Sequence, residues 1–123
     1  MSLQQELEAA ARRVHFACIK VSGSARGDCR EASILLVELL LANKTVESAC
    51  LCQGKYHGRP HCWTRVAAST PIGLERWIVD PTICQFDAAG KFVCQESSGG
   101  AYVEESYVYF CQARLAKLRR ALG

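Results

Sequence analysis

Apolar residues recur every three or four positions at the start of the chain, which is the spacing of a helix with one buried face. From residue 3 to about residue 19 the polar positions fall on the other faces, and the apolar ones are Leu3, Leu7, Ala10, Ala11, Val14 and Cys18. This pattern predicts an amphipathic helix that covers a core. The next residues, 22–27, are Ser-Gly-Ser-Ala-Arg-Gly, a composition that predicts a loop.

A second helix is predicted to begin at Cys29. Asp28 and Glu31 have the spacing of a capping box, in which two side chains satisfy free amides of the first turn. From Ala32 to Ala42 the segment is apolar on nearly all sides, with Glu38 as its only charge. A helix of this kind belongs in the middle of a molecule. It is too short to span a bilayer.

The middle of the chain changes to short alternating segments bounded by turn residues, which predicts antiparallel strands. We expect strands over 48–53, 61–68, 76–79 and 91–95, with a turn-rich stretch at 54–60 and a tight turn at 69–73. The second and third strands would then form a hairpin. A closing helix is expected because apolar positions again recur at helical spacing: Val103, Tyr107, Phe110, Cys111, Leu115, Leu118 and Leu122.

Composition limits the class of protein. A chain of 123 residues has room for one core, so we expect one domain over 1–123 with an α+β fold. Hydrophobic residues make up 50% and charged ones 22%, which excludes intrinsic disorder. The net charge of +3 is dispersed, with no Lys/Arg run longer than Arg119-Arg120, and therefore does not point to nucleic acid.

Neither a membrane span nor a secretory signal is expected, because the first residues include acidic side chains and lack a continuous apolar stretch. This predicts a cytoplasmic protein, or one exported without a classical signal peptide. The chain has 8 cysteines, and in such a compartment we expect them to be mostly reduced. A reduced cysteine serves as a small buried residue, a metal ligand or a nucleophile.

Three residues together suggest nucleophilic catalysis: Cys29 in the first turn of a helix, His61 on one arm of the hairpin, and Asp80 at the end of the other. A thiol attacks as thiolate, and a helix N-terminus stabilises that anion by only about 0.3–1 kcal/mol. A neighbouring imidazolium supplies further stabilisation and later protonates the leaving amine. The imidazole in turn needs an acceptor that fixes its tautomer. We therefore predict Cys29 as nucleophile, His61 as base and acid, and Asp80 as the residue that orients His61.

The hairpin register decides whether His61 meets Asp80. A turn centred between Thr70 and Pro71 makes the position numbers of opposite residues add up to 141 and places His61 opposite Asp80. A sum of 142 places Cys62 opposite Asp80 instead. We predict the first register because it assembles the triad.

Three motifs occur in order along half the chain: Gly27-Asp28-Cys29-Arg30-Glu31-Ala32-Ser33 before an apolar helix, His61-Cys62-Trp63, and Trp77-Ile78-Val79-Asp80-Pro81-Thr82. Together they resemble the core of the transglutaminase-like group of papain-like cysteine hydrolases. The resemblance implies a papain-like core with the Cys29 helix at its centre on a small antiparallel sheet. It also implies a Cys-His-Asp triad acting on amide bonds as peptidase, deamidase or acyl transferase, without a cofactor.

The sequence departs from this group at the oxyanion hole. Where papain keeps a glutamine ahead of its cysteine, this chain has Gly23. We therefore expect backbone amides, including that of Cys29, or the side chain of Gln85 to supply the donors. A protein or peptide substrate is expected to contact Tyr56, Gln85 and an exposed tryptophan, with Trp63 as the candidate.

Two alternatives use the same region differently. One is a zinc site, since sulfur and nitrogen ligands crowd into a short segment: Cys50, Cys52, His57, His61 and Cys62. Their spacing matches no standard zinc pattern. The other alternative is a binding module that presents the basic and aromatic side chains of residues 53–60 to a partner.

Overall fold

The protein is described by a computed structural model that covers residues 2–23, 29–86 and 90–111. Over these residues it has an α+β fold with two α-helices and one antiparallel sheet. The helices are α1 (Leu3–Ser22) and α2 (Cys29–Leu41), and the strands are β1 (Val46–Tyr56), β2 (Arg59–Thr70), β3 (Gly73–Val79), β4 (Val93–Gln95) and β5 (Tyr102–Cys111). Two short 3-10 helices, η1 (Ile83–Gln85) and η2 (Glu96–Ser98), complete the described elements.

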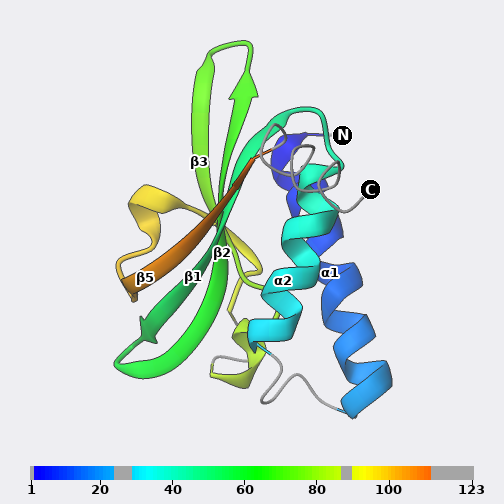
Figure 1. Ribbon diagram of the computed structural model, residues 1–123, viewed down its shortest axis with the longest axis vertical. Helices are drawn as coiled ribbons and strands as arrows, with labels where there is room; N and C mark the ends of the chain where they lie inside the picture. Colours follow the sequence, from blue (N-terminus) through cyan, green and yellow to red (C-terminus); the bar gives the residue numbers. More distant parts are fainter. Residues whose placement is uncertain (1, 24–28, 87–89, 112–123) are drawn as a thin grey trace, which may run out of the picture.

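The strands lie in the order β4-β3-β2-β1-β5, and both helices pack on the same side of the sheet (Figure 1). The main core lies between these two layers. Leu7, Val14 and Leu36 from the helices are fully buried there against Val66 and Val79 of the sheet. The predicted first helix and the predicted start of the second helix at Cys29 are therefore confirmed. The Asp28 half of the expected capping box lies outside the described residues.

Local sequence accounts for the boundaries of α1. Ser2 and Gln5 form a capping box at its start, each side chain hydrogen-bonding the backbone amide of the other. At its end Gly23 takes a left-handed conformation with φ of 76°, which glycine adopts without steric cost. Among the helices that the structure describes, none combines the length and hydropathy that a bilayer crossing requires.

The expected strands are present, but the turn-rich stretch at 54–60 is much shorter than predicted. β1 continues to Tyr56 and β2 resumes at Arg59, so that only His57 and Gly58 form the turn. Both have positive φ, 47° and 78°, as a two-residue hairpin loop requires. His57 therefore lies exposed at the tip of the hairpin.

The predicted hairpin register is wrong by two positions. Thr64 pairs with Val79 and Thr70 with Gly73, so the paired numbers add up to 143 (64 + 79 = 70 + 73 = 143) rather than 141. The loop consists of Pro71 and Ile72. A shift by two residues leaves every side chain on the same face of the strand, whereas a shift by one would reverse the faces. His61 and Asp80 therefore still point to the same side of the sheet.

The predicted closing helix is wrong over its first half, where β5 forms instead. Tyr107, Val108, Tyr109 and Phe110 are aromatic or β-branched, and such side chains fit a pleated surface as well as a helix face. Pairing with β1 decides between the two, with Ala49 opposite Phe110 and Cys52 opposite Tyr107. The remaining residues of the expected helix, 112–122, lie outside the described residues.

Gly54 allows β5 to approach β1 closely. It lies at a register irregularity in the β1–β5 ladder, and a β-carbon there would collide with the carbonyl oxygen of Val103. Gly54→Ala is therefore expected to lower the free energy of unfolding by about 1–3 kcal/mol, measured by urea denaturation. The matched control is Gly100→Ala, whose β-carbon would enter open space. Equal stability of the two variants would contradict the close approach.

Candidate active site

Cys29 is the first residue of α2 and is partly exposed. Two hydrogen bonds hold this first turn against the sheet. The Ser33 hydroxyl donates to the carbonyl of Cys29 at 2.7 Å, and the Thr64 hydroxyl donates to the carbonyl of Ser33 at 3.3 Å. Ser33 and Thr64 are fully buried. The position of the thiol is thus set by β2 as well as by its own helix.

His61 and Asp80 form a buried pair. Nε2 of His61 lies 2.8 Å from Oδ2 of Asp80, and both side chains are fully buried. The β2–β3 pairing ends at Thr64 and Val79, so His61 and Asp80 lie just beyond it and meet diagonally rather than as an opposite pair. The predicted contact between His61 and Asp80 is therefore present, although the predicted register is wrong.

The Asp80 carboxylate accepts hydrogen bonds on both oxygens. Oδ2 accepts from the Tyr102 hydroxyl at 2.8 Å in addition to His61. Oδ1 accepts from the backbone amide of Thr82 at 3.2 Å and lies 3.5 Å from its hydroxyl. A buried charge is costly unless it is hydrogen-bonded. These donors come from β2, β5 and the segment after β3, and together they fix the carboxylate.

Cys29 lies at the edge of the sheet, beside β2. Its thiol hydrogen-bonds the imidazole of His61 and also contacts the backbone amide and side chain of Cys62. Neighbouring residues of a strand point to opposite faces, so a thiol that reaches both must lie at the strand's edge. That edge is open there because β3 pairs with β2 only from Thr64 onward. The early end of the pairing thus provides room for the start of α2.

The electrostatics favour a thiolate and an imidazolium. The pKa of Cys29 is lowered, mainly by the hydrogen bond from His61 and against the effect of burial. Burial alone would lower the pKa of His61, but the hydrogen bonds to Asp80 and Cys29 raise it from 6.5 to about 9. Each group stabilises the charged form of the other. Burial has the opposite effect on five other thiols and raises their pKa: Cys50, Cys52, Cys62, Cys84 and Cys94.

Aromatic rings surround the imidazole. Phe86 meets His61 edge-on at 4.8 Å between ring centroids, Trp63 stacks at 6.1 Å, and Tyr56 lies at 6.2 Å. Trp63 is 2% exposed and Trp77 7%, so the expectation of an exposed tryptophan is wrong. Both pack against the sheet because their large rings complete its two apolar clusters. Tyr56 is also buried, which places it behind the imidazole rather than on the surface.

Gln85 is the predicted substrate-binding residue that the structure leaves partly exposed. Its side-chain nitrogen lies 3.3 Å from Nδ1 of His61, the ring nitrogen that does not contact Asp80. The same nitrogen donates to the Thr82 hydroxyl at 3.3 Å. Gln85 therefore has a polar group on the reactive side of the imidazole.

The candidate zinc ligands do not come together. Cys52 donates to Glu104, His57 lies at the hairpin tip and His61 is held by Asp80. Throughout residues 2–23, 29–86 and 90–111, no three His, Cys, Asp or Glu side chains are placed to hold a metal ion. Six cysteines of the described residues are free thiols: Cys29, Cys50, Cys52, Cys62, Cys84 and Cys94.

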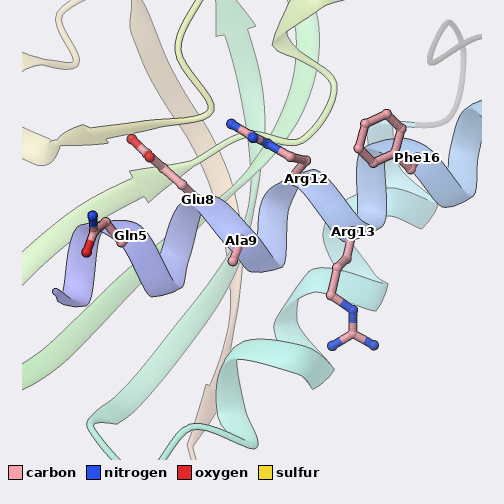
Figure 2. A pocket seen from close by; sticks show the side chains of 6 residues that line it. All are labelled: Gln5, Glu8, Ala9, Arg12, Arg13 and Phe16. Carbon is pink, nitrogen blue, oxygen red and sulfur yellow. The ribbon is translucent and has the colours of Figure 1, made fainter. Parts of the chain in front are cut away.

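A surface hollow of about 630 Å³ lies apart from this site, on the outer face of α1 (Figure 2). None of the triad residues lines it. Its lining side chains are Gln5, Glu8, Ala9, Arg12, Arg13 and Phe16.

Sequence reasoning missed three groups around the triad. Thr82 follows Asp80 by two residues, and this spacing is a local signal for a turn in which an aspartate accepts from the backbone. Tyr102 had no such signal, because it comes just before the expected closing helix and only the β1–β5 pairing brings it near Asp80. Cys62 follows His61 directly, so strand alternation places its side chain on the opposite face and gives no signal that it reaches the site.

The opposite pKa shifts predict that Cys29 reacts before a more exposed thiol. Iodoacetamide at neutral pH should label Cys29 and leave Cys84 largely unmodified until alkaline pH, although Cys84 is exposed. Peptide mass spectrometry across a pH series measures both in one sample. His61→Ala should remove the advantage of Cys29. Labelling of Cys84 at the same pH as Cys29 would show that the thiol is not activated.

His61 and Tyr102 share the Oδ2 atom of Asp80, so Tyr102→Phe is expected to change the pKa of His61. Without the tyrosine hydroxyl, the carboxylate interacts more strongly with the imidazolium, so the pKa of His61 should rise above its value of about 9. An NMR titration of the imidazole measures this shift. The control is Tyr107→Phe, which removes an exposed hydroxyl elsewhere on β5. A fall in the pKa of His61, or no change, would argue against Tyr102 as a donor to Asp80.

No protein-family model, curated protein or solved structure matches the chain. The chemical interpretation of this site therefore depends on its own residues and geometry.

Proposed function

We propose that the protein is a thiol-dependent hydrolase that acts on amide bonds of a protein or peptide, as a peptidase or a glutamine deamidase. One observation carries the proposal: His61 hydrogen-bonds a partly exposed thiol at a helix N-terminus and a buried carboxylate. A nucleophilic thiol, an imidazole base and a carboxylate that orients the imidazole are the catalytic groups of a cysteine hydrolase. The motif resemblance to transglutaminase-like enzymes, and with it a papain-like core, is part of the same proposal.

The first half of the reaction forms a thioester. The Cys29 thiolate attacks the amide carbonyl, an S–C bond forms and the carbonyl oxygen becomes an oxyanion. His61 then gives its Nδ1 proton to the nitrogen of the substrate, and the C–N bond breaks to release an amine or ammonia. Nδ1 is assigned this role because Nε2 is held by Asp80. A raised His61 pKa keeps that proton available at neutral pH.

The second half releases the acid product. His61 takes a proton from water, the hydroxide oxygen attacks the thioester, and the S–C bond breaks to regenerate the thiolate. Gln85, whose amide lies beside Nδ1, is the proposed side-chain donor to the oxyanion or to the substrate. Tyr56 and Trp63 support the imidazole in this scheme, because they are buried around it. An amine in place of water would make the same thioester an intermediate of acyl transfer.

A peptide library with added hydroxylamine tests the proposal, with mass spectrometry as the readout. New chain ends indicate a peptidase, a gain of about 1 Da at glutamine indicates a deamidase, and a hydroxamate indicates acyl transfer. Cys29→Ala is expected to reduce product formation by at least about 1000-fold, because the nucleophile is lost. Cys84→Ala, which removes an exposed thiol outside the triad, should retain wild-type rates. Undiminished product with Cys29→Ala, or no product with the wild type, would overturn the proposal.

A further inference from the structure

Cys62 brings a second sulfur to the nucleophile. It lies on the same face of β2 as Thr64, which is hydrogen-bonded to the first turn of α2. Its thiol and its backbone amide lie close enough to the Cys29 sulfur to change the pKa of Cys29. The proposed reaction uses neither the thiol of Cys62 nor its proton. Cys62 is 8% exposed, whereas Cys29 is open to solvent in part. The pair therefore combines one accessible thiol with one enclosed thiol beside it.

The surrounding structure holds the two sulfurs together. Cys29 begins α2, and Cys62 lies in β2 two residues before Thr64. Thr64 is hydrogen-bonded to the carbonyl of Ser33, one turn along α2 from Cys29. The start of α2 and this part of β2 are thus held together by a hydrogen bond close to both cysteines.

We propose that Cys29 and Cys62 form an oxidation site at which a peroxide joins the two sulfurs in a reversible disulfide and so blocks the nucleophile. The blocking effect rests on the proposed function, since it takes Cys29 as the nucleophile. Formation of the disulfide does not depend on it. The other described thiols lack such a contact with Cys29, and Cys52, for example, is buried and donates to Glu104.

The chemistry proceeds in two steps. The Cys29 thiolate attacks one oxygen of the peroxide, an S–O bond forms, the O–O bond breaks, and the departing oxygen takes a proton from water. The Cys29 sulfur is then a sulfenic acid, and the peroxide has been reduced. Next the Cys62 sulfur attacks the Cys29 sulfur, an S–S bond forms and the S–O bond breaks. The hydroxide leaves as water with the proton of the Cys62 thiol. A dithiol reverses the bond by exchange and is itself oxidised.

The two thiols are suited to these unequal roles. The lowered pKa of Cys29 makes it the thiol that meets the oxidant. The pKa of Cys62 is raised to about 11 by burial and by the nearby Cys29, so Cys62 remains protonated until the sulfenic acid forms beside it. Without a second thiol, a sulfenic acid goes on to the irreversible sulfinic form under excess peroxide. Cys62 would thus preserve the nucleophile during oxidation.

The test exposes the reduced full-length chain to hydrogen peroxide, maps its peptides without reduction, and then adds dithiothreitol. In the wild type we expect a Cys29–Cys62 cross-linked peptide, loss of iodoacetamide labelling at Cys29, and full recovery of labelling after reduction. In Cys62→Ala we expect sulfinic acid at Cys29 and no recovery. Cys84→Ala is the matched control and should behave as the wild type.

Two results would overturn the inference: wild-type protein without the cross-link, or Cys62→Ala whose Cys29 recovers as completely as in the wild type. The first is measured on wild-type protein and does not depend on the folding of a variant. Labelling and mapping also do not require hydrolase activity. A cross-link in a protein that hydrolyses no amide would support the oxidation site and refute the proposed function, whereas activity without the cross-link would do the reverse.

Discussion

The fully buried carboxylate of Asp80 is the constraint on which the site depends. A charge removed from water must be hydrogen-bonded, or it destabilises the fold or becomes neutral. Asp80 meets this need with donors from three parts of the chain: His61, Thr82 and Tyr102. Folding cannot satisfy the carboxylate without also placing the imidazole and fixing which of its nitrogens faces the thiol. The same interaction therefore contributes to stability and prepares the base.

The position of the thiol follows from an interruption in the sheet. β2 is paired with β1 from Arg59 to Ala68, but β3 covers its other edge only from Thr64 onward. The beginning of α2 lies at the uncovered edge, where Cys29 reaches both His61 and Cys62. A longer β3 would occupy this edge. The short pairing thus lets a helix from one side of the sheet contribute to a site whose imidazole is packed among Trp63 and Phe86.

Burial separates Cys29 chemically from the other cysteines. In an enclosed apolar setting a thiol remains protonated, because its anion loses hydration without gaining a partner. This holds for Cys62, whose pKa rises to about 11, and for Cys52, whose pKa rises to about 12. Cys29 is less enclosed and faces a histidine that Asp80 holds. The number of cysteines in the chain is therefore no guide to the number of reactive ones.

Local pattern was enough to determine much of this protein. The periodicity of residues 3–19, the apolar run after Cys29 and the alternating segments around His61 each occupy one short window, so helix, helix start and strands were predicted from them. The order of Cys29, His61 and Asp80 identified the candidate triad. Side chains alternate between the two faces of a strand, so His61 and Asp80 share a face in every register that differs from the predicted one by an even number of residues.

Tertiary pairing decided the rest. Tyr102–Cys111 suits a helix or a strand, and only the free edge of β1 selects the strand. That choice brings Tyr102 to Asp80, a contact absent from any local pattern. The true hairpin register, the burial of Trp63 and the contact between Cys29 and Cys62 likewise depend on how distant segments pack. The sequence by itself determined which residues were chemically suitable and on which elements they lie, because those properties are local. Only the tertiary structure decided which of them meet, because residues far apart along the chain come together through packing that no single window encodes.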